Sequence, residues 1–159
     1  MRLAILIAAA LALTVPAHAQ TAPKGWKVDA SANAWLATSP DQKVRLAFYP
    51  AVKNASALVF WFQEEGLRRT SAYGRNVTNQ DEPRNTTDPE AGPLLAQSRM
   101  LDIGGAPIAV VTYGWQTGKG KQLVQIILPP TAKDSPAYKA AFDEITAAWK
   151  SGVAYAPAG

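Results

Sequence analysis

The chain contains no cysteine, and its single histidine is His18. Without cysteine there is no disulfide, no cysteine nucleophile and no cysteine-ligated iron–sulfur cluster. Because His18 lies in the N-terminal apolar segment, the rest of the chain also lacks the base of a Ser-His-Asp triad and the imidazole ligands of zinc and haem sites. The sequence therefore assigns no catalytic residue, no cofactor and no metal ligand, and it favours a protein that is not an enzyme.

Charge of either sign is sparse, with 16 Lys and Arg against 12 Asp and Glu and a net charge of +4. So small a basic excess is not the signature of a nucleic-acid-binding protein, which clusters Lys and Arg on one surface. Beyond the N-terminus no segment stays apolar over the roughly 20 residues that a spanning helix needs. We therefore expect neither a nucleic-acid partner nor a membrane span after removal of the N-terminal segment.

The N-terminus has the pattern of a secretory signal peptide. Met1-Arg2 is a short basic region, Leu3–Val15 is almost wholly apolar, and Ala17-His18-Ala19 is a small-x-small cleavage site. No cysteine follows this site and only one arginine precedes the apolar run, which excludes lipoprotein and twin-arginine signals. We expect a Sec-type signal peptide over 1–19, cleavage after Ala19 and a periplasmic domain over 20–159. An uncleaved membrane anchor is the alternative.

Residues 34–49 predict a β-hairpin. Val44, Leu46 and Phe48 alternate with less apolar residues, which is the period of a half-buried strand. Pro40 occupies the second position of a type I turn before that strand. A further strand is expected to start near Trp26.

Residues 54–69 fit a helix better than a strand. Glu65 and Arg69 form one of two favourable i,i+4 pairs, each worth about 0.2–0.5 kcal/mol. Two features stand against a helix: the non-polar run over 57–62 and the glycine at position 66. We expect a helix that ends near Gly66 or Arg69.

Residues 76–93 are polar and contain three prolines, which predicts a long loop. Carboxylates at this density could bind Ca²⁺, but their spacing is not that of an EF-hand. The acidic residues are Asp81, Glu82, Asp88 and Glu90. We interpret the segment as a solvated acidic loop.

Residues 95–128 predict two or three strands separated by glycine-containing turns, of which Gly104-Gly105 is the first. A helix follows over 136–150. Ser135 is a suitable N-cap, and Gly152 supplies the C-terminal stop. The apolar residues of this helix form one continuous stripe, so we expect it to pack on the sheet.

This order of elements predicts an α+β fold: a single-domain sandwich in which an internal helix and a C-terminal helix pack on an antiparallel sheet. The sequence resembles the Mog1/PsbP-like family of small α/β sandwiches in its order of elements. The resemblance is carried by Trp26, the 34–49 hairpin, the 54–69 segment and the 136–150 helix. The resemblance covers most of the chain beyond residue 19. It implies the fold of that family and, because the family contains binding and accessory proteins, a role without catalysis. No site residue is transferred from it.

Tyr113 and Trp115 lie on one face of a predicted strand, next to a glycine-rich turn that carries Lys119 and Lys121. Aromatic side chains with a polar group suit contacts with sugars and peptides, so we predict that these four residues form an exposed contact surface. The alternative is that the aromatic rings belong to the core. Residues 114–121 also resemble a phosphate-binding loop, but Lys119 stands where its second glycine belongs, and a hairpin turn fits better.

Two classes of function remain. The favoured one is an exported, non-catalytic binding or accessory protein of the bacterial cell envelope, whose partner is an envelope protein or polymer. The alternative is a periplasmic small-molecule carrier or a carboxylate-dependent hydrolase. That alternative requires an internal pocket holding a buried Asp or Glu of raised pKa.

Overall fold

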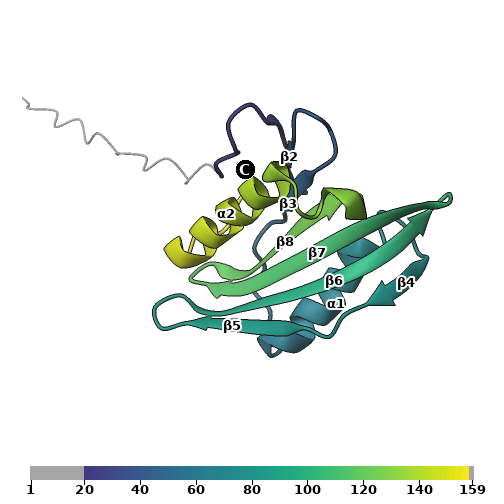
Figure 1. Ribbon diagram of the computed structural model, residues 1–159. Helices are drawn as coiled ribbons and strands as arrows, with labels where there is room; N and C mark the ends of the chain where they lie inside the picture. The colour runs from purple at the N-terminus through teal and green to yellow at the C-terminus, as the bar shows by residue number, and fades with distance from the viewer. Residues whose placement is uncertain (1–19, 158–159) are drawn as a thin grey trace, which may run out of the picture.

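The computed structural model describes residues 20–157, so the predicted signal peptide over 1–19 lies outside the described residues. The described chain forms one antiparallel sheet with a helix on each face (Figure 1), which confirms the predicted α+β sandwich. The strands are β1 (Lys27–Ala30), β2 (Trp35–Thr38), β3 (Arg45–Phe48), β4 (Val77–Gln80), β5 (Arg84–Asp88), β6 (Gly92–Ile103), β7 (Ala106–Thr117) and β8 (Gly120–Leu128). The helices are α1 (Leu58–Thr70), the 3-10 helix η1 (Pro130–Ala132) and α2 (Pro136–Ser151).

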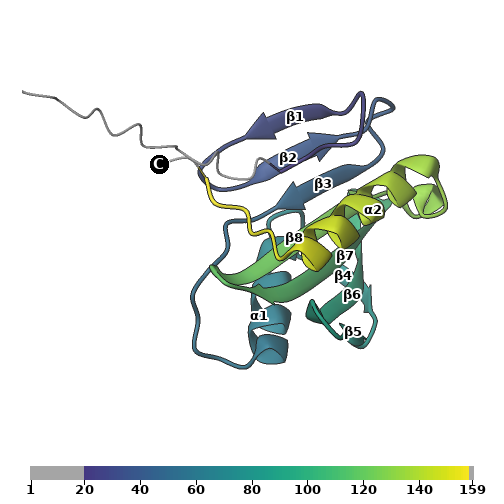
Figure 2. The same ribbon diagram turned by 90° about the vertical axis from the view of Figure 1, so that its left-hand side faces the viewer.

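The eight-stranded sheet runs in the order β1-β2-β3-β8-β7-β6-β4, and β5 also pairs with β6. Two long hairpins, β6–β7 and β7–β8, form its centre, and Gly104-Gly105 closes the first of them. The predicted 34–49 hairpin is confirmed as β2–β3, and β1 adds a strand outside it (Figure 2). The strand expected near Trp26 is therefore confirmed, beginning at Lys27.

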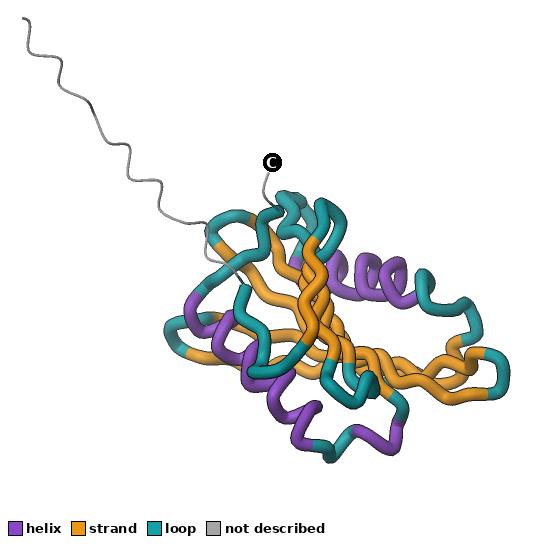
Figure 3. Tube along the Cα trace, turned by 90° about the horizontal axis from the view of Figure 1, so that it is seen from above, coloured by secondary structure: helices purple, strands orange, loops and turns teal. Residues whose placement is uncertain are grey.

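The helices lie on opposite faces of the sheet, as Figure 3 shows from above. Side chains alternate along β7, so neighbouring residues meet different helices. An ideal Cβ on Gly114 would lie 2.6 Å from the Phe62 ring of α1. Tyr113 and Trp115 point the other way and share a cluster with Ile145 and Trp149 of α2.

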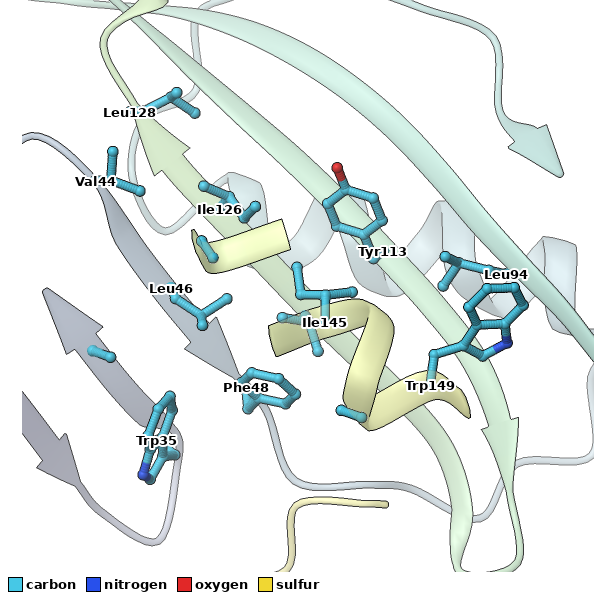
Figure 4. Packing of buried hydrophobic residues seen from close by; sticks show 14 of the residues in the cluster. Trp35, Val44, Leu46, Phe48, Leu94, Tyr113, Ile126, Leu128, Ile145 and Trp149 are labelled. Carbon is cyan, nitrogen blue, oxygen red and sulfur yellow. The ribbon is translucent and has the colours of Figure 1, made fainter. Parts of the chain in front are cut away.

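The larger core lies between α2 and the sheet. Ile145 lies between Phe48 of β3 and Tyr113 of β7, and Trp149 lies beside Leu94 of β6 (Figure 4). The Ser135 hydroxyl accepts a hydrogen bond from the Tyr138 amide at 3.1 Å, and Gly152 ends the helix at φ 66°. Both predicted caps and the packing of this helix on the sheet are thus confirmed, although Phe142 of the predicted stripe is 38% exposed.

The segment predicted as a helix over 54–69 is α1. The non-polar residues of its first turns do not all face the sheet: Trp61 and Phe62 are buried, whereas Phe60 is 68% exposed to solvent. Gly66 has a packing role: an ideal Cβ there would lie 3.2 Å from Nη1 of Arg99 and 3.3 Å from the Thr112 side chain. The glycine lets the helix lie close to the sheet.

The prediction of a long loop over 76–93 is wrong, because β4 and β5 occupy half of it and both pair with β6. These edge strands expose nearly all of their side chains, so no apolar alternation marks them. Pro83 falls between the two strands. There, residues 81–83 oppose only Gln97 and Ser98 of β6, which makes a bulge of one extra residue. Residues 81–83 are called the edge bulge below.

Candidate functional site

Tyr113 and Trp115 are 5% and 0% exposed, so the prediction that their rings form an exposed contact surface is wrong. The physical reason is α2, which covers this face of β7 and places Ile145 and Trp149 in one buried cluster with both rings. Because Tyr113 and Trp115 are two residues apart in β7, their rings lie on the same face of the sheet. The docking of a helix from a distant part of the chain determined that this face is buried.

The two lysines of the predicted surface lie apart from it. Lys119 is exposed in the β7–β8 turn, whereas Lys121 is 4% exposed and lies on the α1 face of the sheet. Nζ of Lys121 donates to the carbonyl oxygens of Asn54, at 2.9 Å, and Ser56. Lys121 therefore fixes the segment that leads into α1, and the four predicted residues form no common surface.

The structure instead opens a cleft on the α2 face of the sheet. It lies between the edge bulge, the β6–β7 hairpin and the start of α2, and it has a volume of about 180 Å³. Its lining residues are Asp81, Glu82, Arg84, Ala96, Gln97, Ser98, Val111, Tyr113, Lys133 and Tyr138. This set is called the edge cleft below. Tyr113 is the one residue of the predicted surface that belongs to it.

Half-buried side chains make the floor of the edge cleft. Ala96 and Ser98 of β6 and Val111 of β7 each retain partial exposure. The Tyr113 and Tyr138 hydroxyl oxygens lie 3.2 Å apart, within hydrogen-bond distance. Burial is the main cause that raises the pKa of Tyr113, so this phenol stays neutral and can donate or accept a hydrogen bond.

The edge bulge makes the outer wall. The Asp81 amide donates to the Ser98 carbonyl at 3.0 Å, and the Gln97 side chain donates to the Asp81 carbonyl at 2.8 Å. These two bonds hold the backbone of the bulge while the side chains of Asp81 and Glu82 stay exposed. The wall is therefore acidic and its backbone is fixed, which suits a binding surface better than a freely moving loop does.

A buried arginine supports the bulge from the other face of the sheet. Arg99 is 2% exposed, and its Nε and Nη2 donate to the side-chain oxygens of Gln80 at 2.8 Å and Gln97 at 2.6 Å. Because Gln97 in turn holds Asp81, the chain of contacts runs from Arg99 to the edge bulge. Desolvation by burial lowers the pKa of Arg99.

Basic residues complete the rim of the edge cleft. Arg84 begins β5, and Lys133 lies on the short connection between η1 and α2. Both side chains are exposed. The rim thus presents acidic groups from the edge bulge and basic groups on either side of it, above a floor with aromatic hydroxyls. Such a mixed rim can orient a polar or zwitterionic segment of a partner through directional contacts.

The size of the edge cleft limits what it can hold. Small-molecule sites usually enclose about 300–1,000 Å³ and bury most of the ligand. At about 180 Å³ the edge cleft accommodates one side chain or one sugar unit of a larger partner. Its lining supplies hydroxyls, carboxylates and cationic groups, which can form hydrogen bonds and ion pairs with such a unit.

Beneath α1 lies a second polar group of residues, and it is closed. The Gln125 side chain accepts a bond from the Tyr49 hydroxyl at 2.8 Å and donates to the hydroxyls of Thr70 and Thr112 at 3.1 Å each. Gln125, Thr70 and Thr112 are fully buried. Desolvation is the main cause that raises the pKa of Tyr49. This network fixes α1 on the sheet.

The buried carboxylate required by the carrier or hydrolase alternative is not found among residues 20–157, whose buried polar side chains include no Asp or Glu. Glu65 of α1 is a half-buried carboxylate that forms ion pairs with Arg68 and Arg69 of the same helix. Its partial burial opposes ionisation, but hydrogen bonds from Arg68 and Arg69 outweigh that effect and lower its pKa. A carboxylate held in its ionised form is a poor general acid.

The acidic residues noted in the predicted loop separate into two places. Asp81 and Glu82 lie on the edge bulge, while Asp88 accepts hydrogen bonds from the Glu90 and Ala91 amides in the turn after β5. Within the described part of the chain, no three acidic or imidazole side chains gather as metal ligands would.

No described helix has the length and apolarity needed to cross a bilayer.

The sequence indicated Tyr113 and the acidic residues Asp81 and Glu82, but not the remaining lining of the edge cleft. Ser98, Lys133 and Tyr138 carry no local signal, because they become neighbours only when the strands and α2 assemble.

No protein-family model and no curated protein sequence matches this chain.

Proposed function

We propose that the protein is an exported, non-catalytic binding or accessory protein of the bacterial cell envelope, and that the edge cleft is where it contacts its partner. Residues 1–19 supply the export signal in this proposal, with cleavage after Ala19. The partner is an envelope protein or polymer rather than a free metabolite, because the cleft is too small to enclose one and is open along the sheet edge.

The observation that carries the proposal is that part of the α2 face of the sheet is not fully covered. A sheet face in a small sandwich is normally covered by its helices. Here the part formed by Ala96, Ser98 and Val111 keeps partial exposure beside two tyrosines, and the rim carries charges of both signs. A floor of this kind with a polar rim is the usual composition of a protein interface.

The depletion of reactive side chains supports the same class of function. Beyond residue 19 the chain contains neither histidine nor cysteine. The tyrosines of the edge cleft have no basic side chain hydrogen-bonded to them that could activate a hydroxyl as a nucleophile. The carrier or hydrolase alternative gains no comparable support from the described residues.

The proposal is tested by filling the cleft. Ser98→Trp places an indole on the half-buried floor, and Thr86→Trp places one on the exposed edge strand β5 as a matched control. Native mass spectrometry is applied to each protein after gentle release from the cells that produce it. We expect a heavier heteromeric species for the wild type and Thr86→Trp, and its loss for Ser98→Trp.

Two results would contradict the proposal. A heteromeric species retained at full abundance by Ser98→Trp would place the contact elsewhere. A small added mass on an otherwise monomeric protein would favour the carrier alternative. The melting temperature of each variant is measured alongside, so that loss of the partner is not confused with loss of the fold.

A further inference from the structure

The sheet ends at β1, whose outer edge has no neighbour in the described chain. All of Lys27–Ala30 is exposed, and Figure 2 shows β1 as the outermost strand of the sheet, on the side away from β6. An unpaired edge strand offers backbone donors and acceptors to another strand. This edge lies at the opposite end of the sheet from the edge cleft and is independent of it.

The hydrogen bonding of β1 to β2 shows which residues face outward. The β1–β2 pairing ends with Ala30 opposite Trp35, so the next pair in the same register is Ser31 opposite Ala34. The Ser31 amide donates to the Ala34 carbonyl at 2.9 Å, which makes this a hydrogen-bonded pair. Bonded and non-bonded pairs alternate in an antiparallel ladder. Asp29 and Lys27 therefore bond to β2, whereas the N–H and C=O of Val28 and Ala30 point to the open edge.

The outward groups restrict how a second copy of β1 could pair. In a two-fold antiparallel pair, the bonded positions must be Val28 or Ala30 of each copy. Centring the two-fold axis on Val28 makes the two Val28 residues exchange both hydrogen bonds. Lys27 of each copy then lies opposite Asp29 of the other, in the non-bonded positions where side chains approach most closely.

The other registers are less favourable. Centring on residue 29 pairs Val28 with Ala30 and places the two Asp29 carboxylates opposite each other, which is repulsive. Centring on Ala30 faces Asp29 with Ser31, at the turn into β2. The register centred on Val28 is the one that satisfies both the backbone and the charges.

The same register also covers apolar surface. Val28 is 45% exposed and lies opposite Ala37 of β2, on the face of the sheet that carries the larger core. Two copies of Val28 would meet on that face, extending the apolar surface across the junction. Lys27 and Asp29 would form their pairs on the opposite face.

We propose that β1 is a self-association edge, at which two copies of this chain join their sheets antiparallel with Val28 opposite Val28 and Lys27 opposite Asp29. The partner is a second copy because the Lys-Val-Asp sequence of β1 is complementary to itself in this register. The contact is short, so the dimer forms reversibly with rising protein concentration.

The experiment uses charge reversal and sedimentation velocity on protein purified from cells expressing the full chain. Lys27→Asp and Asp29→Lys each place like charges opposite one another at two points in the homodimer. We expect each to weaken dimerisation by at least about tenfold. An equimolar mixture of the two variants restores both opposite-charge pairs, and so does the double variant Lys27→Asp/Asp29→Lys.

Lys53→Asp is the control, since it makes the same charge change at an exposed position outside the sheet. It should dimerise as the wild type does. The proposal is overturned if the wild type stays monomeric up to its solubility limit. It is equally overturned if a wild-type dimer is unaffected by the single reversals, or if mixing the two variants restores nothing.

Discussion

Gly114 lies where the Phe62 ring of α1 packs on the sheet. An ideal Cβ there would lie 2.6 Å from Cδ2 and 3.3 Å from Cε2 of the Phe62 ring, and Phe62 is fully buried. We expect Gly114→Ala to lower the free energy of unfolding by about 1–3 kcal/mol, as overpacking of a core does. Gly118→Ala is the control, because no atom lies within 4 Å of its ideal Cβ. Equal urea midpoints for the two variants would contradict this packing.

The buried tyrosines make stability sensitive to alkaline pH. Burial raises the pKa of Tyr49 and Tyr113 above the ordinary value of 10.0. Above about pH 10 the unfolded chain loses tyrosine protons that the folded protein retains, so the free energy of unfolding falls as pH rises. Each such tyrosine contributes up to about 1.4 kcal/mol per pH unit. This contribution is fully present below pH 10 and is lost progressively above it.

The measurement is the urea midpoint of the wild type and of Tyr113→Phe at about pH 8 and about pH 11. Phenylalanine removes the ionisable group from a site that is 5% exposed, so we expect the variant to lose less stability between the two pH values. Identical losses would mean that Tyr113 does not resist ionisation in the folded protein.

At the scale of elements, α2 is the main cover of the larger core. Trp149 is 5% exposed within that core, whereas Phe142 on the same helix is 38% exposed. We expect Trp149→Ala to lower the free energy of unfolding by about 3–5 kcal/mol, and Phe142→Ala to lower it by clearly less. Chemical denaturation of both variants tests this, and comparable losses would contradict the assigned packing face.

Individual helices and strands could be predicted from the sequence where their residues carry local signals. The α2 helix was predictable because its caps, Ser135 and Gly152, and its apolar stripe are local signals. The β4 and β5 strands were not, because side chains exposed on an edge carry no periodic pattern. For α1 the pattern was ambiguous, since its non-polar run includes both the buried Phe62 and the exposed Phe60.

At the scale of the whole molecule, the edge cleft joins parts of the chain that are distant in sequence. Asp81, Ser98, Tyr113 and Lys133 come from the edge bulge, from β6, from β7 and from the connection before α2. Residue types alone could indicate Tyr113 as a contact residue. They could not indicate that the sheet face beside it stays partly uncovered, because that depends on where α2 docks.

Photo-crosslinking in intact cells tests the edge cleft most directly as the contact site. A photoreactive amino acid replaces Ser98 on the cleft floor in one protein and exposed Thr86 on β5 in another. We expect one dominant crosslinked species of defined mass from position 98, and a much weaker one from position 86. Equal crosslinking from both positions, or none from position 98 while other positions capture a partner, would contradict the assignment of the edge cleft as the binding site.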